Sequence, residues 1–334
     1  MKVMTISVGL DVAARSVVMA AHDAGKPVVK GSFEQSPAGH ARLAAQLLKL
    51  APAYVVMEAT GIYHLDLAIA LDRAGLPVSV INPRSAKRFA QLKLKGSKTD
   101  SIDAGLLADY GDALRPPRWS APSPEDLALR DLGRQINRLT SDRTRAKNRL
   151  HALNAKQGTY ALLLDDEADA IATLERRIER LRAAMRALID ADPIRQSQLK
   201  HMIAAPGVAE VSAMALLAEL VMLPTTMKAP QVSRHAGLDV CLNQSGTSVY
   251  GASRISKGGN AYLRAGTYMP ALVAVRHDPL AKAFYDQLVR RGKKKRQALT
   301  AVMRKYLTGL WACIRNDESF DTSKLFSPEH LKNA

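Results

Sequence analysis

The sequence is poor in cysteine and in long apolar runs, and each shortage excludes a class of protein. Its two cysteines, Cys241 and Cys313, lie far apart with no metal-ligand spacing around them, which argues against a disulfide scaffold and against a zinc site. No apolar run approaches the roughly 18 residues of a membrane span, and Asp11 and Arg15 interrupt any signal-like core. We therefore expect a protein of the reducing cytoplasm with no membrane partner.

Aromatic and acidic residues are also scarce. Aromatics make up 5% of the chain, which argues against a platform that stacks the bases of single strands. Asp and Glu number 31 against 48 Lys and Arg, a net charge of +17, and this excess suits a partner that carries phosphates. The excess peaks at residues 290–296 and again over 130–149. An ordinary basic surface remains the alternative for either cluster.

The first third of the chain has an α/β pattern. Strands are expected at 3–10, 16–21 and 28–34, a helix at 37–50, a strand at 54–57, a helix at 62–74 and a strand at 77–81. A three-strand meander followed by alternating helices and strands predicts an RNase H-like (RuvC-like) domain with a mixed sheet. An actin-like or sugar-kinase fold starts the same way, but residues 11–15 lack the glycine that a phosphate loop would need.

The remainder of the chain is mainly helical. Apolar residues spaced three and four apart over 124–190 predict two heptad-bearing helices, and a break at Gly158 makes them an antiparallel coiled-coil hairpin for oligomerisation. Further helices are expected near 197–204, 209–222, 260–275, 279–291 and 295–315, with 224–259 irregular. The predicted domains are thus 1–123, an α/β metal-site domain; 124–192, the coiled coil; and 193–334, a mainly α C-terminal domain.

Four carboxylates stand where such a domain would bring them together. Asp11 and Glu58 each end a predicted strand, and Asp100 and Asp103 are three apart on one helix face. Four converging carboxylates need compensating cations, and hard oxygen ligands suit Mg²⁺. Two such ions would stabilise the attacking and leaving oxygens of a phosphodiester exchange. Each residue taken alone is more often structural.

Short motifs make the pattern specific. They are Gly9-Leu10-Asp11, Glu58-Ala59-Thr60-Gly61, Asn82-Pro83, Lys98-Thr99-Asp100-Ser101-Ile102-Asp103-Ala104, Ala236-Gly237-Leu238, Gln244-Ser245-Gly246 and Ile255-Ser256-Lys257-Gly258-Gly259-Asn260. Over nearly the whole chain this set resembles the IS110 and IS1111 insertion-sequence transposases, which are relatives of the Piv invertase.

The resemblance implies a RuvC-like domain with a DEDD metal site at Asp11, Glu58, Asp100 and Asp103, which would bind Mg²⁺ or Mn²⁺. It also implies a coiled coil and a C-terminal serine nucleophile at Ser245, with Ser248, Ser253 and Ser256 as nearby rivals. The partners implied are donor and target double-stranded DNA, a structured bridge RNA that guides their choice, and further copies of the chain, from a dimer to a tetramer. Such a protein would be bacterial and cytoplasmic, and nucleoid-associated when active.

A serine hydroxyl is a weak nucleophile that needs a base or a metal, so pairing Ser245 with the four carboxylates makes chemical sense. Without the resemblance, a turn residue would be the simpler interpretation of Ser245. Phosphate contacts are expected at Gly207, in a stretch that resembles a helix-hairpin-helix element, and at a set of basic residues. These are Arg254, Lys257, Arg264, Arg290, Arg291, Lys293, Lys294, Lys295 and Arg296.

Three functions compete. The first is a transposase that cuts and rejoins DNA through a covalent serine-DNA intermediate. The second is a RuvC-like nuclease or resolvase, in which water attacks and Ser245 is structural. The third is a basic architectural protein that binds nucleic acid without chemistry, which is disfavoured because all four acidic positions are filled.

Overall fold

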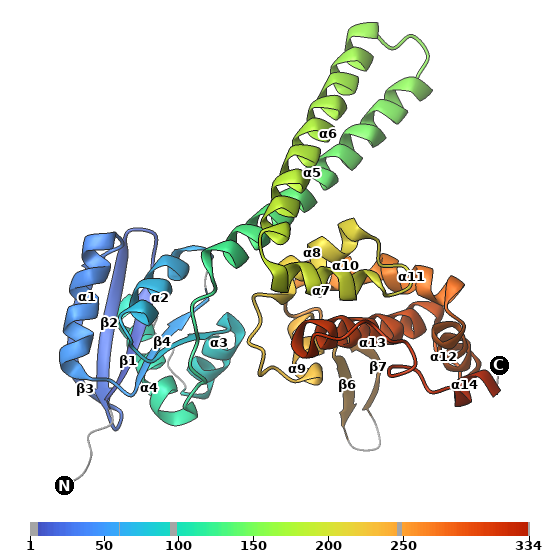
Figure 1. The fold of residues 1–334 in the computed structure, drawn as a ribbon. Coiled ribbons are helices and arrows are strands. Elements are labelled where there is room, and N and C mark those ends of the chain that lie inside the picture. Colours follow the sequence, from blue (N-terminus) through green and yellow to red (C-terminus); the bar gives the residue numbers. More distant parts are fainter. Residues whose placement is uncertain (1–5, 60, 94–98, 246–248, 333–334) are drawn as a thin grey trace. The chain divides into compact units, whose positions relative to one another are not determined.

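The chain folds into two compact units, 1–122 and 123–334. The structure, a computed structural model, describes residues 6–59, 61–93, 99–245 and 249–332. In this described part, no helix combines the length and the apolar character needed to cross a lipid bilayer. The first unit is α/β and the second is mainly helical (Figure 1), as the sequence predicts.

A mixed five-stranded sheet forms the centre of the first unit. Its strands lie in the order β3-β2-β1-β4-β5. The meander β1-β2-β3 is antiparallel, whereas β4 runs parallel to both β1 and β5. The strands are β1 Ile6–Val12, β2 Ser16–Asp23, β3 Lys26–Glu34, β4 Tyr54–Glu58 and β5 Val78–Ile81. Each lies within a few residues of its predicted position. Buried apolar residues mark β1, β2, β4 and β5, whereas β3 has no buried residue and packs the half-buried Val29 and Phe33 on the core.

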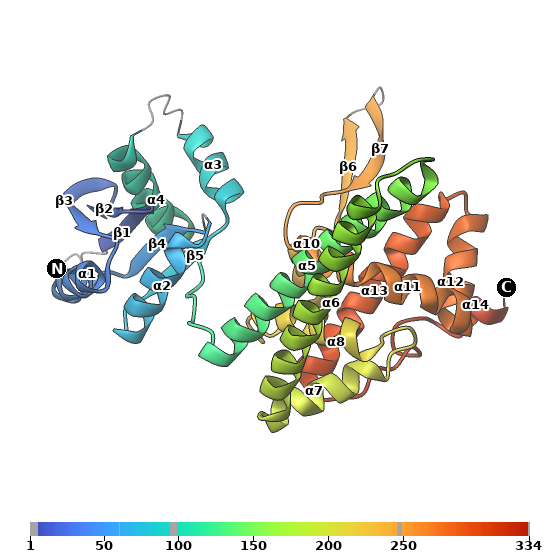
Figure 2. The same cartoon turned by 90° about the horizontal axis from the view of Figure 1, so that it is seen from above.

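Helices cover both faces of this sheet. On one face α1 (Pro37–Leu50) and α2 (Tyr63–Arg73) bury Leu43, Leu47, Leu67 and Leu71 against Val8, Leu10, Val55 and Met57. On the other face lie α3 (Pro83–Leu92) and α4 (Asp100–Leu114), where Phe89, Leu107 and Tyr110 pack on Val56 and Ile81. Figure 2 shows the two helix pairs on opposite sides of the strands. Strands buried on both faces read as continuous apolar runs, which is how β4 and β5 appear in the sequence.

The second unit begins with two long antiparallel helices, α5 (Pro124–Ala155) and α6 (Ala161–Asp190), which lie side by side in both views. Ion pairs Arg149–Glu167 and Lys147–Glu175 cross between them and fix the antiparallel sense. Leu139, Ala146, Ile171 and Ile178 are buried along the predicted stripe. Exposed ion pairs contribute less than about 1 kcal/mol each, so the apolar stripe supplies most of the stability of the pair.

The base of this helix pair shares one core with the C-terminal helices. Leu129, Met185 and Ile189 pack in the same cluster as Trp311 and Tyr306 of the long helix α13. The helices are α7 Pro193–Ile203, α8 Glu210–Leu220, α9 Ala229–His235, α10 Ala261–Gly266, α11 Tyr268–His277, α12 Pro279–Arg290, α13 Lys295–Asn316 and α14 Glu329–Lys332. The structure therefore joins the helix pair and the C-terminal helices in one compact unit.

Two expectations for this unit were wrong. The single helix expected at 260–275 is interrupted at Thr267, between α10 and α11, because Pro270 has no N–H to donate to the Gly266 oxygen four residues earlier. The region expected to be irregular, 224–259, contains α9 and a two-stranded antiparallel ribbon, β6 (Val240–Ser245) and β7 (Val249–Ile255). Its strands are short and only partly apolar, so their periodicity was weak.

Candidate functional site

Two of the four predicted acidic residues end neighbouring strands. β1 and β4 are parallel and in register, with Leu10 opposite Met57, so the next residues, Asp11 and Glu58, stand at the same height on adjacent strands. Both are half-buried. Because side chains alternate along a strand, and Leu10 and Met57 face the core under α1 and α2, Asp11 and Glu58 belong to the other face, which α4 covers.

The packing of α4 brings the other two acidic residues to the same end of the sheet. A Cβ added to Gly9 would lie 2.0 Å from the Ala104 oxygen, and one added to Gly111 would lie 3.0 Å from Val56 and 3.4 Å from Ser7. The chain direction of α4 is therefore opposite to that of β1, with the C-terminal half of α4 next to the N-terminal half of β1. The first turn of α4, with Asp100 and Asp103, accordingly lies toward Asp11 and Glu58.

The N-terminus of α4 favours negative charge. Asp100 and Asp103 occupy the first turn of α4, and Thr99 caps that helix by accepting from the Ile102 N–H at 3.3 Å. The partial positive charge of a helix N-terminus stabilises carboxylates there. Asp100 is exposed and Asp103 half-buried.

The donor chemistry of these four carboxylates fits a hard cation such as Mg²⁺. Among the residues that the structure describes, however, no three His, Cys, Asp or Glu side chains are grouped closely enough to hold one ion. The four acidic residues thus share one end of the sheet without forming a closed ligand set, and the metal site stays a prediction.

Ser245 lies in the second unit, at the end of β6. Its backbone pairs with Val249 of β7, so the two strands form a ribbon, here termed the arm (residues 240–245 and 249–255), with Ser245 at the end of β6. Ser248 and Gly246 lie outside the described residues. Ser253 lies within β7, whereas the Ser256 hydroxyl donates to the Asp239 carboxylate and accepts from the Gly258 N–H. Because these bonds already occupy its hydroxyl, Ser256 is a less suitable nucleophile than Ser253.

The predicted phosphate-contacting residues fall into two groups. Arg254, Lys257 and every residue from Arg290 to Arg296 are exposed, with Gly292 in the left-handed region (φ 80°) turning the chain between α12 and α13. Arg264 instead donates to the Ala236 oxygen at 2.8 Å. Gly207 also packs inward, because a Cβ there would lie 2.8 Å from the Pro270 oxygen of α11. The residues of the exposed group are accessible to a polyanion, and their contacts with phosphates stay a prediction.

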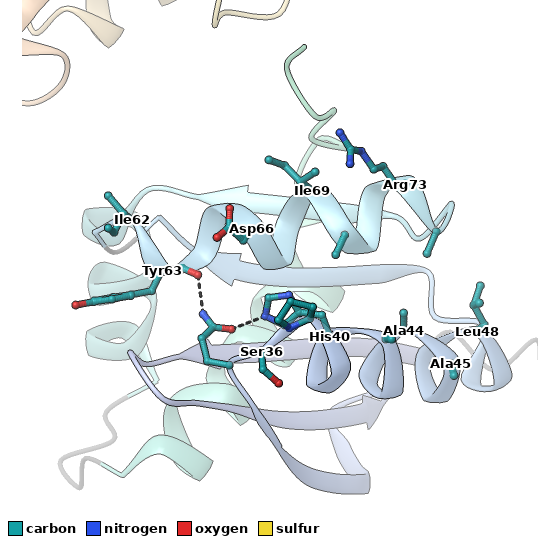
Figure 3. A pocket seen from close by; sticks show the side chains of 15 residues that line it. Ser36, His40, Ala44, Ala45, Leu48, Ile62, Tyr63, Asp66, Ile69 and Arg73 are labelled. Carbon is teal, nitrogen blue, oxygen red and sulfur yellow. Dashed lines mark hydrogen bonds between the residues drawn. The ribbon is translucent and has the colours of Figure 1, made fainter. Parts of the chain in front are cut away.

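A pocket of about 800 Å³ lies between α1 and α2 (Figure 3). Small apolar residues such as Ala44 and Ala45 line it, and His40 is hydrogen-bonded to Gln35 at 2.6 Å, while Gln35 donates to the Tyr63 oxygen. Burial lowers the pKa of His40, against an opposing effect of Asp66. Because this pocket faces away from α4, it is not part of the acidic end of the sheet.

Sequence reasoning missed one buried polar cluster. Glu219 of α8, which is 4% exposed, accepts hydrogen bonds from Arg134 of α5 and from Asn260 at the start of α10. The signal was present, because Glu219 stands in an otherwise apolar helix, and a charge there requires partners.

Comparisons with known proteins give two family matches for this chain. Residues 8–153 match a family model for the DEDD transposases of IS110, described as "Transposase". Residues 200–286 match one described as "Transposase IS116/IS110/IS902 family".

Individual proteins are similar over most of the chain. The Pilin gene-inverting protein of Moraxella bovis is 29% identical over 273 residues, which cover 80% of this chain and 82% of that protein. The homologue of Moraxella lacunata shows the same values. The insertion element IS110 uncharacterized 43.6 kDa protein of Streptomyces coelicolor is 25% identical over 217 residues, which are 65% of this chain and 52% of that protein.

Proposed function

Because the chain belongs to the IS116/IS110/IS902 family of transposases, we propose that it cuts and rejoins DNA strands through a serine-linked intermediate at a site that uses divalent metal. It is a transposase, an enzyme of DNA recombination. The two Moraxella relatives are named for inverting a pilin gene, which supports strand exchange rather than simple degradation as the reaction.

One observation carries the proposal. Asp11, Glu58, Asp100 and Asp103 come from three separate elements, and the register of β1 with β4 and the contact of Gly9 with α4 direct them to one end of one sheet. The strand order β3-β2-β1-β4-β5, with β2 antiparallel to β1, supports assignment of the unit as RNase H-like. A structural role would not require four carboxylates at one end.

These four residues would hold the metal. A divalent cation bound there would neutralise charge on the phosphate under attack and on the departing oxygen. The protein's own part is to supply oxygen ligands on rigid elements, two at strand ends and two on the first turn of a helix. We propose Mg²⁺ as the resident ion, with Mn²⁺ as a substitute.

In the proposed reaction, the Ser245 hydroxyl oxygen forms a bond to phosphorus while the bond from phosphorus to the departing deoxyribose oxygen breaks. The serine proton passes to a base, and the departing oxygen gains a proton. The phosphodiester is exchanged and not hydrolysed. The hydroxyl of a new strand end can therefore attack the serine-linked phosphorus, which restores a DNA phosphodiester and frees the serine.

The remaining partners are proposals that the resemblance to this family supports. We propose donor and target duplexes as substrates and a structured RNA guide that selects them, since base pairing reads sequence while the protein reads backbone. We further propose that α5 and α6 form a coiled coil that assembles two to four copies, and that the protein acts at the bacterial nucleoid.

The test is a search for the covalent intermediate. The protein is incubated with donor and target DNA, its flanking non-coding RNA and Mg²⁺, and the products are separated on a denaturing gel and identified by mass spectrometry. We expect a DNA-linked peptide that contains Ser245, lost in Ser245→Ala and retained in the matched control Ser253→Ala from the facing strand. Metal-dependent cutting without any adduct would replace the proposal with a nuclease that uses water.

A further inference from the structure

A single buried carboxylate holds the base of the arm. Glu219 accepts two hydrogen bonds from the Arg134 guanidinium, Nε to Oε1 at 2.6 Å and Nη2 to Oε2 at 2.9 Å. Its Oε2 also accepts from the Asn260 side-chain amide at 2.5 Å. Three elements therefore meet at this one side chain: α5, α8 and the residue on which α10 begins.

Asn260 is fully committed to this junction. Its side-chain oxygen caps α10 by accepting from the Tyr262 and Leu263 N–H groups at 2.9 and 3.1 Å. Its own N–H donates to the His235 oxygen, at the end of α9, at 2.6 Å. The Arg134 guanidinium also lies 4.9 Å from the Tyr262 ring centroid, so Arg134 and Asn260 hold the same turn.

The residues that flank the arm pair with each other next to this turn. The Ser256 N–H donates to the Asp239 oxygen at 3.0 Å, and the Lys257 N–H donates to the Gly237 oxygen at 3.1 Å. Gly259 has a φ of 142°, and a Cβ there would lie 2.1 Å from the His235 oxygen. With backbone packed this closely, a shift of Asn260 must shift the residues at which β6 begins and β7 ends.

The orientation of the arm depends on the residues that flank it, at the start of β6 and the end of β7. Within the described residues, β6 and β7 pair only with each other, and an isolated two-stranded ribbon is marginally stable at best. A buried carboxylate such as that of Glu219 is tolerated only when its partners satisfy it. Removing one partner leaves an uncompensated charge and allows the junction to move.

We propose that Glu219 is a positioning residue that acts through Asn260 to hold the arm in a fixed direction and through Arg134 to couple the arm to α5. The inference rests on the proposed function, in which the arm carries the nucleophile Ser245. Glu219 is 4% exposed, so we assign it no contact with DNA or with the reacting atoms.

The experiment exchanges donor and acceptor between the two residues. Asn260→Asp keeps a good N-cap for α10 but sets a carboxylate against Glu219. Glu219→Gln removes the charge and leaves one oxygen to accept from the Arg134 Nε–H, while the bond from Arg134 Nη2 to Oε2 is lost. In the double variant E219Q/N260D, the amide introduced on α8 can donate to the carboxylate introduced at the start of α10, which restores the hydrogen bond with its direction reversed.

Two measurements on the full-length protein follow the exchange. We expect Asn260→Asp to lower the rate of serine adduct formation about ten- to hundredfold with little change in DNA affinity, and the double variant to recover most of that loss. Hydrogen–deuterium exchange of residues 240–256 should rise about tenfold in the single variant and return toward the original value in the double variant.

Asp126→Asn is the matched control, because Asp126 is buried and accepts two hydrogen bonds from Arg195 in the same unit. It should leave exchange in the arm unchanged. Unchanged exchange in folded Asn260→Asp, or a rise throughout 123–334, would overturn the proposal. If the arm responds as expected but the unaltered protein forms no serine adduct, the anchoring stands and the serine mechanism fails.

Discussion

At the scale of single residues, the direction of a side chain on β1 decides whether the residue packs in the apolar core or lies on the face of the proposed metal site. Val8 and Leu10 are fully buried under α1 and α2, whereas Asp11 is half-buried on the other face. A strand period of two makes this division automatic. A substitution at Asp11 that keeps its size should therefore leave the apolar core undisturbed.

This separation predicts the effect of Asp11→Asn. The substitution preserves shape and removes the charge that a divalent cation needs, so strand cleavage should fall by at least about a hundredfold while nucleic-acid binding and thermal stability stay nearly unchanged. Cleavage of labelled DNA and a gel-shift titration measure the two effects.

Asp23→Asn is the matched control, because Asp23 pairs with Ile6 at the opposite end of the same sheet and should retain full cleavage. Loss of binding or of folding in Asp11→Asn would instead assign Asp11 a structural role.

At the scale of elements, the contact of α4 with β1 decides whether the acidic residues meet. A Cβ on Gly9 would lie 2.0 Å from the Ala104 oxygen and 2.4 Å from the Ala108 nitrogen. Both are backbone atoms, which cannot move aside as a flexible side chain could. The glycine thus lets α4 lie directly on the strand, with its first turn toward Asp11.

Gly9→Ala should therefore destabilise the first unit and displace Asp100 and Asp103. We expect a loss of about 3 kcal/mol, the upper end of the usual cost of overpacking, with a fall in cleavage even where the protein remains folded. Urea unfolding followed by hydrogen exchange in β1 and β4 measures the loss.

The comparison variant for this prediction is Gly31→Ala on β3, where the added Cβ would meet a Phe33 ring carbon at 3.1 Å. A side-chain ring can adjust, so this change should cost less than about 1 kcal/mol. Equal losses of unfolding free energy in the two variants would show that the contact of Gly9 with α4 does not account for the effect of Gly9→Ala.

At the scale of the whole molecule, the net charge of +17 predicts salt-dependent binding to nucleic acid. The exposed turn between α12 and α13 concentrates that charge. Replacing Lys293, Lys294 and Lys295 by Gln should weaken binding to duplexes of any sequence. It should also reduce the slope of log affinity against log salt by about 0.9 for each phosphate that the variant no longer neutralises.

The matched control replaces Arg176, Arg177 and Arg180, exposed residues of α6, by Gln. This variant loses the same charge elsewhere, so a similar drop in slope would mean that net charge, rather than the turn, governs binding. Titrations by fluorescence anisotropy at several salt concentrations separate the two cases.

Local signals in the amino-acid sequence were sufficient to locate the five strands and the helices α1 and α2 of the first unit, but they did not predict α3 or the bounds of α4. Long apolar runs bounded by turn residues located β1, β4 and β5, and strand ends located Asp11 and Glu58. Heptad spacing likewise located α5 and α6. These features could be predicted because the spacing of apolar residues within a single strand or helix is enough to identify it.

How these pieces meet became clear from the folded chain alone. The face on which Asp11 lies and the approach of α4 over Gly9 depend on contacts between residues far apart in the chain. So does the junction of Arg134, Glu219 and Asn260, which come from three separate elements. A single carboxylate in the apolar helix α8 signals that partners must exist, but its sequence cannot name them, because long-range packing selects them.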